Sequence, residues 1–125
     1  MNKEEILALE AETADPAIIA VEVMGWHKNY STMTWVDSDG ILVAFISSWN
    51  PWKDISAAMQ VLDELKKDWD CITLFWDVGA WDIILESYDI SETFCLGKES
   101  GLTYKELPEA ICRIALLSQI RRKSR

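Results

Sequence analysis

The sequence has few of the residues on which most catalytic and metal sites depend. Its 125 residues include one histidine, His27, and five glycines. Zinc sites need several histidine or cysteine ligands at close spacing, and a Ser–His or Cys–His pair would have to use His27, which no nucleophile motif accompanies. No glycine-rich phosphate loop is present either. We therefore expect no catalytic residue, no metal and no cofactor, although a site built from two of the 21 acids stays open.

Disulfide patterns and long apolar runs are also missing. Cys71, Cys95 and Cys112 are odd in number, far apart and in apolar surroundings, which predicts reduced core residues and a reducing compartment. Residues 1–12 carry five charged side chains and no long apolar core, so neither a signal peptide nor a membrane span is expected. These features predict a cytoplasmic protein.

Positive charge is scarce. The chain has 12 Lys and Arg against 21 Asp and Glu, a formal net charge of -9. A nucleic-acid binder needs clustered cations that displace counterions from phosphates, and the one dense basic run, residues 121–125, is expected to be a solubilising tail. Binding to nucleic acid is therefore not expected.

The length and the 50% hydrophobic content suit one domain, residues 1–125, around one core. Periodicity, caps and turn residues predict helices over 3–10, 16–24 and 54–69 and from Pro108 onward, and strands over 32–36, 41–46, 71–77, 81–88 and 92–98. Residues 37–40 are predicted to be a plain turn and not a calcium loop. Short connections favour a mostly antiparallel sheet with helices packed on it, the α+β class.

Three segments, residues 22–26, 54–62 and 108–117, together with the short start at residues 3–9, resemble the small bacteriophage and prophage proteins of the phage ABA sandwich domain family. The resemblance covers most of the chain, and residues 32–46 depart from it. It implies an α-β-α sandwich made inside an infected or lysogenic bacterium. Its motifs are helix-packing sequences that carry no active site.

Seven tryptophans are the unusual feature of the composition. Those on predicted strands and on the long helix, Trp35, Trp69, Trp76 and Trp81, are expected in the core. The others lie in predicted surface segments, and with their neighbours they suit a concave ligand-binding site that stacks a flat ring and holds an anion: Trp26, His27, Lys28, Tyr30, Trp49, Trp52 and Lys53. Rings that fasten loops to the sheet, or that form a subunit contact, are an equal alternative.

Two functions follow as hypotheses. In the first, a phage-encoded binding protein sequesters a small host molecule, such as a nucleotide immune signal, without catalysis and so evades host defence. In the second, an acidic inhibitor or nucleic-acid mimic binds a host defence protein. The final helix is apolar almost all round, so a homo-oligomer is also expected.

Overall fold

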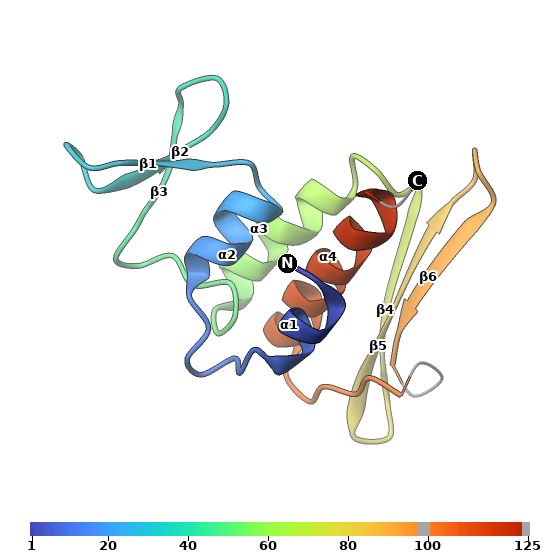
Figure 1. Ribbon diagram of the computed structural model, residues 1–125. Coiled ribbons are helices and arrows are strands. Elements are labelled where there is room, and N and C mark those ends of the chain that lie inside the picture. The colour runs from blue at the N-terminus through green and yellow to red at the C-terminus, as the bar shows by residue number, and fades with distance from the viewer. Residues whose placement is uncertain (98–100, 124–125) are drawn as a thin grey trace.

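The computed structural model describes residues 1–97 and 101–123, and for residues 121–123 it describes the backbone alone. Within these residues the elements follow one another as α1 (Lys3–Ala8), α2 (Pro16–Glu22), β1 (His27–Asn29), β2 (Thr34–Val36), β3 (Leu42–Phe45), α3 (Ile55–Leu65), β4 (Cys71–Asp77), β5 (Ala80–Ser87), β6 (Glu92–Leu96) and α4 (Leu107–Lys123). The helices form a middle layer between two sheets (Figure 1). The predicted α+β class with antiparallel strands is confirmed, but the strands form two sheets of three with the helices between them, where one sheet between layers of helices was expected.

Side chains at the N-termini of the helices set where three of them begin. Asn2 and Glu5 form a capping box on α1, Asp15 accepts from the backbone N–H of Ala17 ahead of α2, and Asp54 accepts from that of Ser56 at 3.0 Å. Each oxygen satisfies a backbone donor that the first helical turn leaves unpaired. The predicted starts are therefore confirmed at these three helices.

The first sheet has the order β1-β2-β3 and is antiparallel throughout. Asp37 closes its β2–β3 turn, because its carboxylate Oδ1 accepts from the backbone N–H groups of Asp39 and Ile41 at 2.9 and 3.0 Å. The predicted plain turn is thus confirmed. Strand β1 was not predicted, since three polar residues carry no periodicity that distinguishes a strand from a loop.

The second sheet is the meander β4-β5-β6, as the three apolar runs predicted. Val78 and Gly79 join β4 to β5 with φ of +37° and +86°. Two residues of positive φ between antiparallel strands form a type I′ turn, whose twist matches that of the strands. Tyr104 extends this sheet by one bridge, in which its carbonyl accepts from the N–H of Trp81 at 2.9 Å.

Helix α4 lies at the centre of the molecule. Every residue from Ala110 to Ser118 is buried, and α4 packs against α1, α2, α3, β5 and β6. Contacts within one chain therefore cover α4. The apolar surface of this helix was the reason to expect a homo-oligomer, so the homo-oligomer stays a prediction that α4 no longer supports. The backbone of residues 121–123 of the predicted basic tail belongs to α4, while the rest of that tail lies outside the described residues.

Alkaline pH is expected to destabilise the fold through Cys112. The three cysteines form no disulfide, and burial raises the pKa of the Cys112 thiol far above its usual range. In the unfolded chain this thiol ionises near pH 8.5, so above that pH the unfolded state releases a proton that the folded state keeps. The contribution is intact below about pH 8.5 and falls by about 1.4 kcal/mol per pH unit above it.

Urea unfolding at a series of pH values from neutral to about pH 10.5 measures this slope. The matched variant Cys112→Ala should give a shallower slope, because the remaining titrating groups are common to both proteins. Burial also raises the pKa of Tyr104, whose phenol is retained in the variant. Parallel slopes for the two proteins would contradict the assignment to Cys112.

Candidate binding surfaces

The tryptophans expected to offer open ring faces are buried. Trp26 and Trp49 are 8% and 5% exposed, and their ring centres lie 4.8 Å apart at an angle of 55°. The Trp49 indole N–H donates to Oε1 of Gln60 at 2.7 Å, which fastens its loop to α3. The expectation of surface rings was wrong here because these short loops fold back onto the helices, where an indole loses most contact with water.

Trp52 is 2% exposed and lies in different surroundings. The guanidinium carbon of Arg113 is 5.1 Å from its ring centre and 5.3 Å from that of Tyr104. The contact is a cation–π arrangement inside the fold. Trp52 is therefore a core residue that packs on α4, and its expected open ring face was also wrong.

The polar residues of the predicted site remain at the surface. His27 and Lys28 are exposed on β1, Tyr30 is 74% exposed after it, and Lys53 is exposed beside Trp52. The ammonium group of Lys28 lies 5.5 Å from the ring centre of Trp35. The structure does not bring the seven residues around one hollow. Whether any of them binds a ligand stays a prediction.

Each of the three buried indoles lines a hollow of its own. The hollow at Trp26 measures about 410 Å³, the one at Trp52 about 430 Å³ and the one at Trp49 about 400 Å³. Trp52 and Lys53 do share a hollow, but three carboxylates line it as well, those of Glu12, Glu106 and Glu109. This lining opposes the binding of a phosphate, because the negative side chains outnumber the one lysine.

The hollow at Trp26 lies between the β2–β3 turn and α3 and is lined by Asp37, Asp39, Asp63, Glu64 and Lys67. Two of these carboxylates form ion pairs with lysines of the same chain. Lys66 Nζ lies 2.7 Å from Asp63, and Lys67 Nζ lies 2.9 Å from Glu64, whose hydrogen bond raises the pKa of Lys67. The hollow is acidic, but its two α3 carboxylates already have cationic partners.

The sheet β4-β5-β6, which we call the acidic sheet, has charged residues of one sign only, unlike the hollow at Trp26. Residues 71–97 contain no Lys, Arg or His and five acids, Asp77, Asp82, Glu86, Asp89 and Glu92. Large apolar side chains are exposed at the end of β4 and at the two turns: Phe75, Trp76, Val78, Tyr88 and Ile90. Trp76 was predicted in the core and is 53% exposed, because its end of β4 provides only an edge contact with Trp81, with ring centres 5.5 Å apart.

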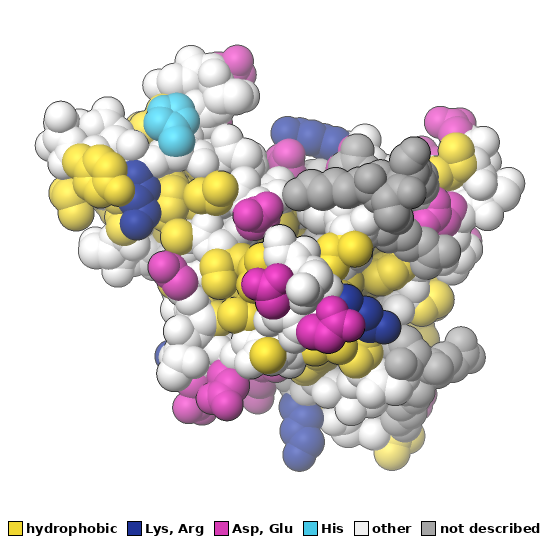
Figure 2. Space-filling view, viewed as in Figure 1, with side chains coloured by type: hydrophobic (Ala, Val, Ile, Leu, Met, Phe, Trp, Pro, Cys, Tyr) yellow, Lys and Arg dark blue, Asp and Glu magenta, His cyan; other side chains and the backbone are white. Residues whose placement is uncertain are grey.

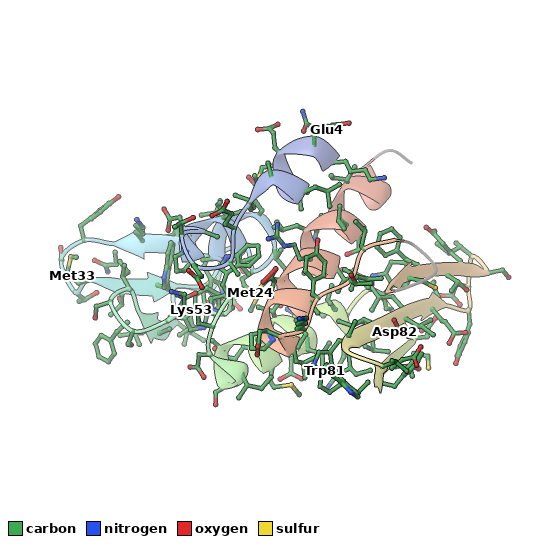
Figure 3. All side chains as sticks on the ribbon, turned by 90° about the horizontal axis from the view of Figure 1, so that it is seen from below. Glu4, Met24, Met33, Lys53, Trp81 and Asp82 are labelled. Carbon is green, nitrogen blue, oxygen red and sulfur yellow. The ribbon has the colours of Figure 1, made fainter. Side chains whose placement is uncertain are left out.

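The first sheet also exposes apolar side chains, among them Met33 and Phe45. Figure 2 shows hydrophobic side chains gathered over this sheet, with basic and histidine side chains beside them. In Figure 3, Met33 lies at its outer end, while Trp81 and Asp82 of the acidic sheet lie on the other side of the molecule. The strands of the first sheet are three or four residues long, and residues 27–45 contain both basic and acidic side chains, Lys28 on β1 and Asp37 and Asp39 in the β2–β3 turn.

Arg113 is the residue that the sequence analysis missed. It is buried in α4 and donates to the carbonyl oxygens of Ile6 and Leu9, and Oε1 of Glu109 lies 3.5 Å away. Its guanidinium thus ties α1 and the residue that ends it to the central helix. A single arginine within the apolar segment 110–117 was the available signal, since a charge in such a place requires partners.

No helix among the described residues is long and apolar enough to cross a membrane. Likewise, within the part of the chain that the structure describes, no group of three or more His, Cys, Asp or Glu is placed to hold a metal ion.

Comparison with known proteins gives a match to a family model described as the phage ABA sandwich domain. The match runs over residues 17–116, from α2 into α4, and so covers most of the chain. No curated protein and no solved structure shows significant similarity to it.

Proposed function

Since this chain belongs to the phage ABA sandwich domain family, we propose that it is a phage-encoded binding protein that captures a basic host protein without catalysis. The observation that carries the proposal is the acidic sheet, whose residues 71–97 include five acids and no Lys, Arg or His and expose apolar side chains at the end of β4 and at both turns. An acidic surface attracts a basic partner over several ångströms and speeds its association. The apolar side chains supply the area that a specific contact buries.

Capture of a nucleotide is supported less well by the same structure. Stacking needs an open ring face, whereas Trp26, Trp49 and Trp52 are each more than nine-tenths buried. Phosphate binding needs cations, whereas three glutamates surround Lys53 in the hollow at Trp52. The nucleotide hypothesis stays a prediction, which a nucleotide titration followed by tryptophan fluorescence and thermal shift can test.

Reversing charge on the acidic sheet is expected to abolish capture of the partner. In the variant Glu86→Lys/Asp89→Lys, the sheet loses two carboxylates and gains two cations. The control Glu4→Lys/Glu10→Lys makes the same change in net charge on and just after α1, where both side chains are exposed. Glu4 lies away from Trp81 and Asp82 (Figure 3). At low ionic strength the sheet variant should bind at least about tenfold more weakly, a difference of about 1.4 kcal/mol.

The measurement is affinity capture from host lysate at low and at raised ionic strength, with both variants and the unmodified protein in parallel. Proteins retained by the unmodified chain and the control, lost with the sheet variant and weakened by salt are the expected result. Equal capture by both variants would show that the acidic sheet does not bind the partner. No salt-sensitive capture at all would contradict the proposal as a whole.

A further inference from the structure

We infer that β4 is the docking strand of the acidic sheet, and that an extended basic segment of the partner pairs with its outer edge as an added strand. The inference rests on the proposed function and states where and how the partner binds. It starts from the sheet order, in which β4 is a terminal strand and β5 is its neighbour. A terminal strand presents backbone donors and acceptors that another chain can pair with.

The edge of β4 lacks most of the features that keep sheet edges from pairing, and its one charged residue is Asp77 at its last position. Its seven residues contain no Lys and no Pro, and its register with β5 runs without a shift from Cys71↔Glu86 to Asp77↔Ala80. Edge strands are ordinarily protected by lysines, prolines, bulges or a very short length. Strand β1 of the other sheet has two of these protections, since it is three residues long and contains Lys28.

The turn identifies which backbone groups face outward. In a hairpin closed by two residues, the flanking pair, here Asp77 and Ala80, is hydrogen-bonded, and bonded pairs alternate with non-bonded pairs along the ladder. The residues between the bonded positions direct their N–H and C=O groups away from β5. On β4 these residues are Ile72, Leu74 and Trp76.

The side chains of β4 define the partner segment. Ile72 and Leu74 face the core, whereas Thr73 and Phe75 are exposed on the outer face. On that face Glu86 stands opposite Cys71 in the neighbouring strand. A paired segment therefore needs apolar residues on its inner side and is favoured by basic residues on its outer side, which reach Glu86 and the ring of Phe75.

Val78 supports a contact at the end of this edge. It is a β-branched residue with φ of +37° and is 82% exposed. Positive φ is strained for such a residue, and asparagine or glycine is the usual choice in this turn. An apolar side chain held in water by a strained backbone, two positions from Trp76, extends the apolar strip that a partner would cover.

Charge decides between a foreign segment and a second copy of the chain. Pairing two copies through β4 would bring together two copies of the segment 71–97, each of which has five acidic residues and no Lys, Arg or His in its sequence, and this costs electrostatic energy. A basic segment removes that cost. The occupant is therefore an extended polypeptide that alternates apolar and basic residues.

Amide hydrogen exchange on the unmodified protein tests the inference directly. The probe is a peptide of alternating valine and lysine with blocked ends, and the control peptide has glutamate in place of lysine. On binding the lysine peptide, the amides of Ile72, Leu74 and Trp76 should exchange at least about tenfold more slowly. No binding at millimolar peptide, or binding without protection of these three amides, would overturn the docking strand. Protection that appears without peptide and rises with protein concentration would instead assign the edge to a second copy.

A pair of variants at one position isolates the backbone. Trp76→Pro removes an outward N–H, which edge strands tolerate, whereas Trp76→Val removes the same indole and keeps the N–H. The proline variant should bind the lysine peptide at least about tenfold more weakly than the valine variant. Equal affinities would refute strand pairing, and should the proline variant fail to fold, the exchange experiment decides alone. Suppose that the host partner is lost with the variant Glu86→Lys/Asp89→Lys and yet is captured equally by Trp76→Pro and Trp76→Val. That result would support the proposed function and refute only the assignment of β4 as the docking strand.

Discussion

Replacing Arg113 with methionine is expected to lower the free energy of unfolding by about 3 kcal/mol. Methionine fills part of the volume but cannot donate, so the carbonyl oxygens of Ile6 and Leu9 lose their buried donor. The change also removes the cation between the rings of Trp52 and Tyr104. The Ile6 oxygen keeps the backbone N–H of Leu9 at 3.2 Å, so the cost comes from the loss of two charge-assisted hydrogen bonds and of the packing of the guanidinium between the two rings.

Urea unfolding of the variant and the unmodified protein measures this loss. Lys66→Met is the matched control, since it breaks the exposed ion pair with Asp63 and should cost less than about 1 kcal/mol. Hydrogen exchange should speed up in α1 first, because Arg113 holds its C-terminal end. An Arg113→Met protein as stable as the control would show that α1 is held by apolar packing at Ile6 alone.

Trp52→Ala is expected to cost about 3–5 kcal/mol, the range for removing a large buried aromatic side chain. A tryptophan that served only as an open ligand platform would cost less than about 1 kcal/mol on truncation. Urea unfolding therefore separates a core role from a surface role without knowledge of any ligand. Trp52→Phe, which keeps an aromatic ring at the site, is the control and should retain most of the stability.

The energy of the contact between Trp52 and Arg113 can be measured separately from the cost of replacing either residue alone. A double-mutant cycle with Trp52→Leu, which removes the aromatic ring, and Arg113→Met cancels the effects of burial that each change has alone. Most of the remaining coupling belongs to the cation and the ring, and about 1 kcal/mol is expected for a desolvated pair. A coupling of zero would mean that their 5.1 Å proximity carries no energy.

Much of the fold could be predicted because its signals are local. The cap at Asp54 and the apolar spacing from Ile55 to Leu65 define α3, and turn residues separate the strands of the acidic sheet. The division into two sheets could not be predicted in this way. It depends on whether the strands before α3 pair with the strands after it. Such pairing joins residues far apart in the chain, and short windows of sequence carry no signal for it.

The predicted binding site was less successful for a related reason. Polar and turn residues placed Trp26, Trp49 and Trp52 correctly in connections, but a connection can fold back and bury its indoles, which the Gln60 contact of Trp49 accomplishes. The opposite error occurred at Trp76, where strand alternation assigned the core and the strand extends past the layer that would cover it. Periodicity gives the face of an element and not the extent of the layer packed on that face.

Helix α4 has a consequence for how the protein is made in the cell. It follows in the chain every element on which it packs, namely α1, α2, α3, β5 and β6. While the ribosome is still synthesising β6, the apolar surfaces of the earlier elements lack α4, the helix on which they pack in the folded protein. The core can therefore close only after residues 110–118 have left the exit tunnel, and until then the nascent chain exposes the apolar surface that makes incomplete chains prone to aggregate.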